Sequence, residues 1–139
     1  MKLSTKGRYG LRAIVDLAIN GNDGPVPISS IADRQSLSES YLEQLMAKLK
    51  KAGLVTSIRG AQGGYCLSRD ASEISIGDIL RALEGDINVD CVGLTKDGKI
   101  KCPRSSLCVS KVVWRRINDA IAETVDALSL GAILKETIE

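Results

Sequence analysis

Residues 30–67 read SIADRQSLSESYLEQLMAKLKKAGLVTSIRGAQGGYCL, and this stretch decides the fold. Its first four residues have capping-box spacing, with an Asp in the last position, and predict a short helix that ends near Gln35. Ser36-Leu37-Ser38 forms a tight turn, and Ser38 can cap a second helix whose apolar stripe ends at Gly53. Two helices joined by about three residues predict a helix-turn-helix, whose second helix enters the major groove in nucleic-acid binders.

A β-hairpin is expected directly after the second helix. Residues 54–58 and 65–67 are β-prone, and the glycine-rich segment 60–64 between them can take positive φ. A helix-turn-helix followed at once by a hairpin is the winged-helix arrangement. Arg59 stands at the hairpin tip, where a basic side chain can enter a minor groove.

Outside this unit, helical spacing of apolar residues predicts a first helix over residues 5–20. A second capping-box-like start at Ser75 predicts a helix over 76–84 that stops at Gly85. Residues 109–127 carry a stripe that begins like a two-stranded coiled-coil seam, and a last short helix is expected over 130–134. The members of the stripe are Val113, Trp114, Ile117, Ile121, Val125 and Leu128.

The predicted fold class is therefore mainly α with a small β-hairpin wing. Residues 1–85 form a winged helix-turn-helix domain, 86–108 a cysteine-containing loop, and 109–139 a long dimerisation helix with a short terminal helix. The loop has no apolar periodicity and is long for a structureless connection, which favours a functional role.

Composition agrees with one small globular unit. The 139 residues are 44% hydrophobic and 26% charged, and the absence of Phe predicts a core of aliphatic side chains. Residues 1–70 hold 10 Lys and Arg against 6 Asp and Glu, whereas residues 71–139 hold 9 against 11. A basic first half is compatible with a polyanionic partner and equally with a solvated basic surface.

Several classes of protein are excluded or disfavoured. No apolar run approaches the roughly 18–20 residues of a membrane span, and no signal peptide is recognisable, so a cytoplasmic protein is expected. The chain contains no His, which rules out Ser-His and Cys-His catalysis and His-ligated zinc. It also lacks a C-x-x-C motif. An enzyme with a cysteine nucleophile or thiol–disulfide exchange is therefore not expected.

Three of the four cysteines lie in the loop. Cys91, Cys102 and Cys108 have the spacing C-x10-C-x5-C, with glycines and lysines between and around them. Three thiols on such a loop can hold an iron–sulfur cluster or zinc, or they can be incidental thiols of a reducing compartment. Cys66 lies in the second hairpin strand, where a small packed side chain or a redox role are both open.

Four blocks of sequence carry a family resemblance: Lys6-Gly7-Arg8-Tyr9-Gly10, residues 37–45, Gly53-Leu54-Val55 and residues 57–65. Together they resemble the Rrf2 family of bacterial winged-helix transcription regulators, and are most similar to its iron–sulfur cluster regulators. The resemblance runs from Met1 to about Leu134. It implies a homodimer that binds a double-stranded DNA operator, with the long C-terminal helix crossing to the partner subunit.

The resemblance also implies DNA contacts on the second helix of the motif. Ser40, Tyr41 and Gln44 share one face with Glu43 beside them, and their polar groups suit base edges. Core packing is an equally open role for Tyr41, and Glu43 would filter target sequences rather than add affinity. Contacts to phosphates are expected from Lys6, Arg8, Lys48 and Lys51, with Arg59 from the wing.

For the loop, the resemblance implies a [2Fe–2S] cluster bound by Cys91, Cys102 and Cys108. The family commonly has C-x5-C-x5-C, so the first interval is longer here. The fourth ligand is unknown, because Lys111 stands where one type has a His, and Arg8 stands where another type has a carboxylate. Asp90, Asp97, Ser105, Ser106 or an exogenous thiol or water remain as candidates. A cluster held in this way would be labile, so that purified protein can be empty.

The sequence thus predicts a transcription regulator, a repressor, that senses iron–sulfur or redox status through its three-cysteine loop. The alternative is a cysteine-metabolism repressor of the same family that responds to a partner protein and has no cluster.

Overall fold

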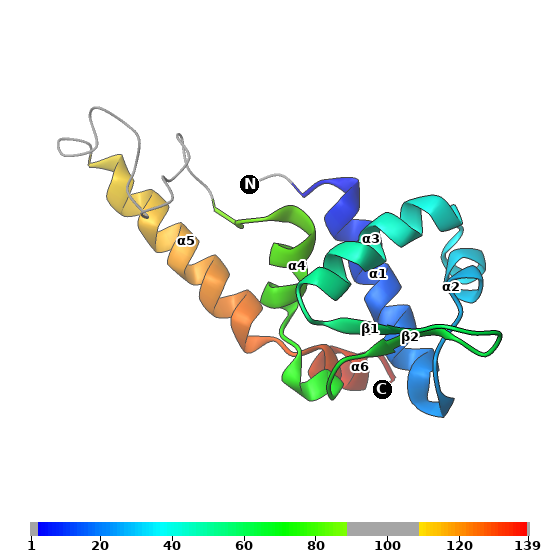
Figure 1. Ribbon diagram of the computed structural model, residues 1–139. Coiled ribbons are helices and arrows are strands. Elements are labelled where there is room, and N and C mark those ends of the chain that lie inside the picture. The colour runs from blue at the N-terminus through cyan, green and yellow to red at the C-terminus, as the bar shows by residue number, and fades with distance from the viewer. Residues whose placement is uncertain (1–2, 89–108, 139) are drawn as a thin grey trace.

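A computed structural model describes residues 3–88 and 109–138. The winged unit contains α1 (Thr5–Asn20), α2 (Ile28–Gln35), α3 (Glu39–Lys51), a hairpin of β1 (Val55–Ile58) and β2 (Gly64–Leu67), and α4 (Ile76–Glu84). The winged unit also contains two short 3₁₀ turns, η1 (Gly21–Asp23) and η2 (Ala71–Glu73). It is followed by α5 (Ser110–Ala127) and α6 (Leu130–Ile138). Figure 1 shows α5 running out from this unit past α4. The predicted fold class is confirmed.

Local capping accounts for the starts of α1, α3 and α4. The Ser4 side chain accepts a hydrogen bond from the Lys6 N–H at the start of α1, and Ser38 accepts one from the Tyr41 N–H at the start of α3. Ser75 caps α4 through the Asp78 N–H. These side chains satisfy N–H groups that have no partner inside the helix, so the predicted helices at 5–20 and 76–84 are confirmed.

The start of α2 was predicted wrongly. Ser30 lies inside the helix, which begins at Ile28 after Pro27, and Pro27 makes no side-chain cap. The cause is tertiary: Val26 forms a two-way backbone bridge with Tyr65 of β2, at 2.9 Å in each direction. The chain is therefore extended up to Pro27 and can turn helical immediately after it. The last helix also differs, because α6 continues to Ile138 instead of ending near 134.

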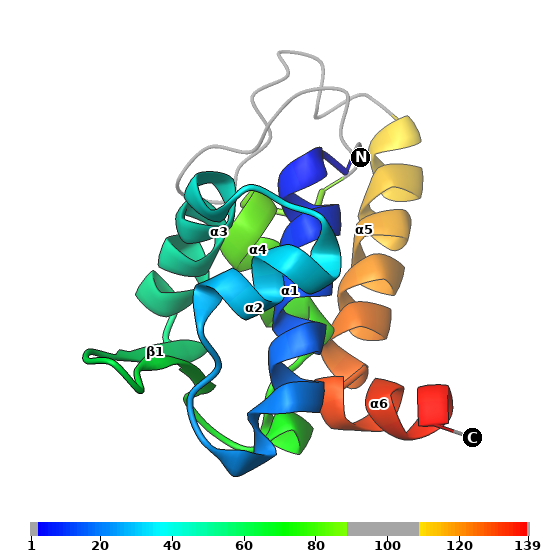
Figure 2. The same cartoon turned by 90° about the vertical axis from the view of Figure 1, so that its right-hand side faces the viewer.

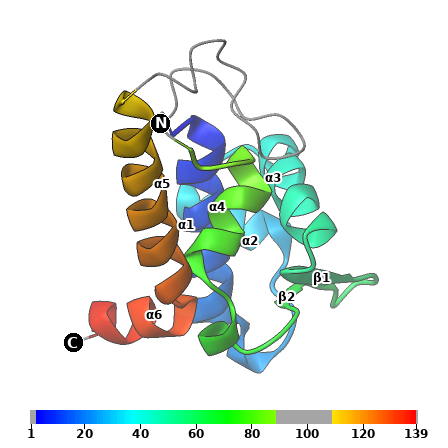
Figure 3. The same ribbon diagram turned by 90° about the vertical axis from the view of Figure 1, so that its left-hand side faces the viewer.

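The core is aliphatic, as the composition predicted. α1, α3 and α4 contribute most of the side chains that are almost fully buried, and they are joined by Val55 of β1 and by Leu54 and Ile74 from the connecting segments. Leu130 of α6 is also buried in this cluster. Figures 2 and 3 show α1 and α4 lying between α3 on one side and α5 on the other.

Candidate nucleic-acid interface

The α2–α3 turn places one face of α3 outward. The backbone of Ser36 takes a left-handed conformation (φ 56°), and Leu37 donates its N–H to the Ala32 carbonyl at 3.0 Å, which reverses the chain within three residues. α3 then buries the four apolar residues Leu42, Leu45, Met46 and Leu49. Five predicted contacts on α3 are exposed: Ser40, Glu43, Gln44, Lys48 and Lys51.

Tyr41 is the one predicted contact on α3 that is half-buried. Its ring meets Tyr9 edge-on, with 6.3 Å between ring centroids, and its hydroxyl lies 3.2 Å from the Thr5 hydroxyl. The structure therefore gives Tyr41 a packing role, tying the start of α3 to the start of α1. A contact of its hydroxyl with DNA stays a prediction.

Arg12 was not singled out from the sequence, yet it connects α1 to the end of α2. Its guanidinium lies 5.3 Å from the centre of the Tyr9 ring and donates hydrogen bonds to the backbone and side-chain oxygens of Gln35, at 2.9 and 3.0 Å. The only sequence signal is the i, i+3 spacing of Tyr9 and Arg12 on one helix face.

Asp16 is a second residue that sequence reasoning missed. This buried carboxylate of α1 accepts hydrogen bonds from Arg34, the shortest at 2.7 Å, and from Gln35 at 2.9 Å. Burial raises the pKa of Asp16, but the hydrogen bonds and charge of Arg34, with Gln35 and Asn20, outweigh it and lower the pKa below its ordinary value. Asp16 and Arg12 together fix α2 against α1, and so fix the turn that orients α3.

The N-terminus of α1 meets α3 and the end of α4 at an open cleft of about 560 Å³. Lys6 and Lys48 both line it, so the structure brings together two of the predicted phosphate contacts. Arg8 is exposed on α1 and does not line this cleft. Arg81 also lines the cleft, where it is paired with Asp126. The two lysines favour contact with successive phosphates of a nucleic-acid backbone.

Glu84 fixes the start of α1 in this cleft. Its Oε1 accepts hydrogen bonds from the Ser4 hydroxyl at 2.6 Å, the Ser4 N–H at 2.9 Å and the Gly7 N–H at 2.8 Å. These bonds, that of the Ser4 hydroxyl first, hold the pKa of Glu84 below its usual range. A Cβ at position 7 would lie 2.6 Å from the same oxygen, which explains the glycine of the Lys6-Gly7-Arg8 block.

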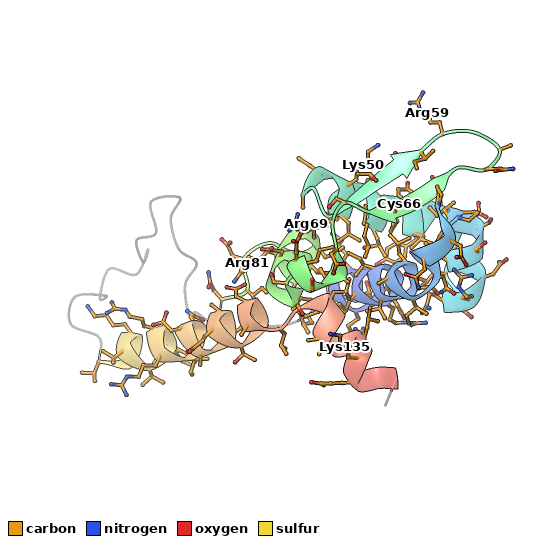
Figure 4. All side chains as sticks on the ribbon, turned by 90° about the horizontal axis from the view of Figure 1, so that it is seen from below. Lys50, Arg59, Cys66, Arg69, Arg81 and Lys135 are labelled. Atoms are coloured by element: carbon orange, nitrogen blue, oxygen red, sulfur yellow. The ribbon has the colours of Figure 1, made fainter. Side chains whose placement is uncertain are left out.

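The hairpin carries Arg59 away from the body of the protein. Arg59 directly follows β1 and is exposed, and Figure 4 shows its side chain pointing outward from the tip. Gly60 has φ 117° and closes the turn through its carbonyl, which accepts from the Gly63 N–H at 3.0 Å. Lys50 of α3 donates to the Ser57 hydroxyl of β1 at 2.7 Å, and thus ties the wing to α3.

Two further residues concern the second strand of the wing: Cys66 belongs to β2, and Glu43 of α3 acts electrostatically on Tyr65 of β2. Burial raises the pKa of Tyr65 in β2, and the charge of Glu43 in α3 raises it further. Cys66 is half-buried and pairs across the hairpin with Thr56. Its predicted place in the second strand is confirmed, with β2 starting one residue earlier than expected.

The cysteines of the loop lie outside the described residues, as do Asp90, Asp97, Ser105 and Ser106. Across residues 3–88 and 109–138, no group of three or more Cys, Asp or Glu side chains could hold a metal ion. Lys111 and Arg8 stand at the two positions that the family resemblance offered for a fourth cluster ligand. Lys111 is half-buried in the first turn of α5, and Arg8 is exposed on α1. An ammonium and a guanidinium are not cluster ligands, whereas three thiolates suit iron–sulfur chemistry.

α5 has no buried residue between Ser110 and Ala127. Its first half exposes Val112 (44%), Val113 (52%) and Ile117 (37%), and Val109, directly before the helix, is 83% exposed. In the part of the chain that the structure describes, no helix is long and apolar enough to cross a membrane.

Comparisons with known proteins agree with this arrangement. The profile of the Rrf2 family, described as iron-dependent transcriptional regulators, matches residues 3–136. The HTH-type transcriptional regulator IscR of Vibrio campbellii is 41% identical, over 98% of this chain and 79% of the relative. The IscR of an Escherichia coli strain (O1:K1) is 40% identical, over 96% of this chain and 80% of the relative.

Solved structures of two kinds share the fold. The T. potens IscR structure is 46% identical with a TM-score of 0.77, covering 99% of this chain and 88% of that one. The structure of CymR, the global cysteine regulator of B. subtilis, is 41% identical with a TM-score of 0.78, covering 98% of each chain.

Proposed function

The chain belongs to the Rrf2 family of transcriptional regulators, and we propose that it is a homodimeric repressor that responds to iron–sulfur or redox status. As a member of this family it is a DNA-binding transcription regulator and not an enzyme. The observation that carries the proposal is the outward face of α3, with polar side chains at its start and lysines at its end.

We assign base contacts to Ser40, Gln44 and Glu43, and phosphate contacts to lysines and arginines around them. An amide can bond two atoms of adenine, and a carboxylate can accept from cytosine N4. Glu43 repels phosphates, so it selects sequence and adds no affinity. Lys6, Arg8, Lys48 and Lys51, with Arg59 on the wing, neutralise the backbone and set the register.

The proposed dimer forms through α5. Its 18 residues are about 27 Å long, and none of them is fully buried within the described part of the protomer, where Val112, Val113 and Ile117 are exposed. A second copy of the same helix would cover Val113, Ile117 and Ile121 symmetrically, because a two-fold interface uses one patch twice.

We assign a [2Fe–2S] cluster to Cys91, Cys102 and Cys108. When bound, such a cluster supplies a redox-sensitive centre held by thiolates. Three thiols fit three of its four ligand positions, and neither Lys111 nor Arg8 suits the fourth. The site is therefore expected to lose its cluster easily, which suits a sensor.

The similarity to CymR supports one alternative, in which the chain is a cysteine-metabolism repressor without a cluster. Anaerobic reconstitution with iron and sulfide separates the two functions. The wild type and Cys66→Ala should take up iron and sulfide and show a visible absorption spectrum, and Cys102→Ala should not. Equal uptake by wild type and Cys102→Ala, or none by the wild type, favours the alternative.

A further inference from the structure

α5 is attached to the winged unit by a backbone bridge near its C-terminus. Ile76 donates its N–H to the Leu128 carbonyl, and Leu130 donates to the Ile74 carbonyl, both at 2.8 Å. Leu128, which ends α5, has an extended backbone with φ −85° and ψ 122°. A single extended residue between a helix and a bridge is a point about which the helix can rotate.

One ion pair stands beyond this bridge. Arg81 of α4 bonds Asp126 of α5 through two nearly parallel contacts, Nη1 to Oδ1 at 2.6 Å and Nη2 to Oδ2 at 3.0 Å. Both side chains are partly exposed, at 35% and 47%, so the pair contributes little to stability. Its two-pronged geometry, however, fixes direction as well as distance.

The helix opposite Asp126 is shaped to receive this pair. A Cβ at Gly77 of α4 would collide with the Asp126 carboxylate and come within 2.9 Å of the Arg81 guanidinium. Glycine weakens a helix interior, so its place here is explained by the space it leaves for the pair. The backbone bridge holds the C-terminal end of α5, and the ion pair holds α5 to α4 beside it. Together they determine the angle of α5 relative to the winged unit.

This angle has a large effect at the other end of α5. Figures 1 and 4 show α5 extending from its junction with α4 away from the winged unit. The exposed Val112 and Val113 belong to the end of α5 that is far from this junction. A rotation of roughly 10° at the junction moves the far end of a 27 Å helix by about 5 Å. That exceeds the rise of one base pair, which is about 3.4 Å.

We propose that Arg81 and Asp126 are positioning residues that set the distance between the two α3 helices of the dimer, and hence the half-site spacing that the protein selects on DNA. The inference rests on the proposed function, in which two copies associate through α5. In such dimers the half-site spacing mirrors the geometry of the protein.

The test compares full-length proteins on a spacing series. Operator duplexes are first selected from a random library with the wild type, and the two half-sites are then moved apart or together by one and two base pairs. We expect the wild type to prefer one spacing by at least about tenfold. Asp126→Asn, Arg81→Met and Gly77→Ala should reduce this preference to within about threefold. Asp126→Asn and Gly77→Ala leave the cations of the cleft in place, so these two should bind a single half-site as the wild type does.

Gly77→Ala places a Cβ where the Asp126 carboxylate and the Arg81 guanidinium lie, so it displaces the pair without removing a charge, and alanine is favoured over glycine inside a helix. Glu123→Gln, which neutralises an exposed carboxylate of the same helix, is the matched control and should keep the wild-type preference. An unchanged preference in the three variants overturns the inference, as does dissociation of their dimers in sedimentation. A wild type that is monomeric, or that selects no DNA sequence, overturns the proposed function and this inference with it.

Discussion

The winged unit and α5 contain similar apolar side chains but differ in how far they bury them. In α3, Leu42, Leu45 and Met46 are at most 1% exposed within one protomer. In α5, Val112, Val113 and Ile117 are 44%, 52% and 37% exposed. The first region therefore buries its apolar residues within one copy of the chain, whereas the second leaves apolar side chains exposed in the part of the chain that the structure describes. The proposed dimer would cover them with a second copy of the same helix.

The largest effect is expected on dimerisation, from placing charged side chains in the apolar stripe of α5. Replacing Ile117 and Ile121 by Glu places unpaired carboxylates in the proposed seam, and the dimer should be lost at micromolar concentration because buried charges are costly. Sedimentation gives the mass, and circular dichroism shows that the winged unit stays folded. Arg115→Glu, about 200° round the helix from Ile117, should remain dimeric. A dimer that survives the double substitution contradicts the assignment of the interface.

A core substitution should act within one protomer instead. Leu45→Ala removes a side chain that is 1% exposed, and we expect the free energy of unfolding to fall by about 2–5 kcal/mol. Urea denaturation at two protein concentrations measures it, and the size of the loss should not depend on concentration. Ile19→Ala, at a position 51% exposed in α1, should change stability by no more than about 0.5 kcal/mol.

The hydrogen bonds of Asp16 should make the stability of the winged unit depend on pH. Asp16→Asn should lower the free energy of unfolding at pH 7 by about 1–3 kcal/mol, because a charge-assisted network loses its acceptor. The folded-state pKa of Asp16 lies below its ordinary value of 3.8, so this stabilisation is complete above that value and is lost as the pH falls through the folded-state pKa. The difference between the urea midpoints of wild type and variant should therefore be similar at pH 7 and pH 5 and smaller at pH 3. A difference that stays constant down to pH 3 would show that charge is not the cause.

The smallest expected effects concern the reading face itself. Gln44→Ala should weaken binding to the selected operator and relax base preference at one position, by roughly 1–3 kcal/mol. Arg59→Ala should weaken binding to all sequences alike. It should also reduce the slope of the logarithm of the binding constant against the logarithm of salt concentration by about 1. Each variant is the control for the other in titrations of specific and random duplexes at several salt concentrations. Equal losses on both duplexes for Gln44→Ala would contradict its assigned role.

Sequence patterns determined the elements whose causes are local. The caps at Ser4, Ser38 and Ser75 and the apolar periodicity act within a few residues, so they predicted the bounds of α1 and α4 and the turn before α3. Family blocks added the expectation of DNA contacts on α3 and the wing. The exposed polar face of α3 agrees with that expectation, while the contacts themselves, and the ligands in the loop, stay predictions.

Tertiary structure decided what depends on residues distant in the chain. The start of α2 follows from the bridge of Val26 to Tyr65, and Tyr41 is drawn to Thr5 and Tyr9 across 36 and 32 positions of sequence. Glu84 reaches back to Ser4, and Arg81 reaches forward to Asp126. A carboxylate or guanidinium on a helix surface looks solvated in any sequence pattern, because its partner is chosen by the packing of whole helices. The residues that orient α1, α3 and α5 relative to one another were therefore visible only once the fold had brought them together.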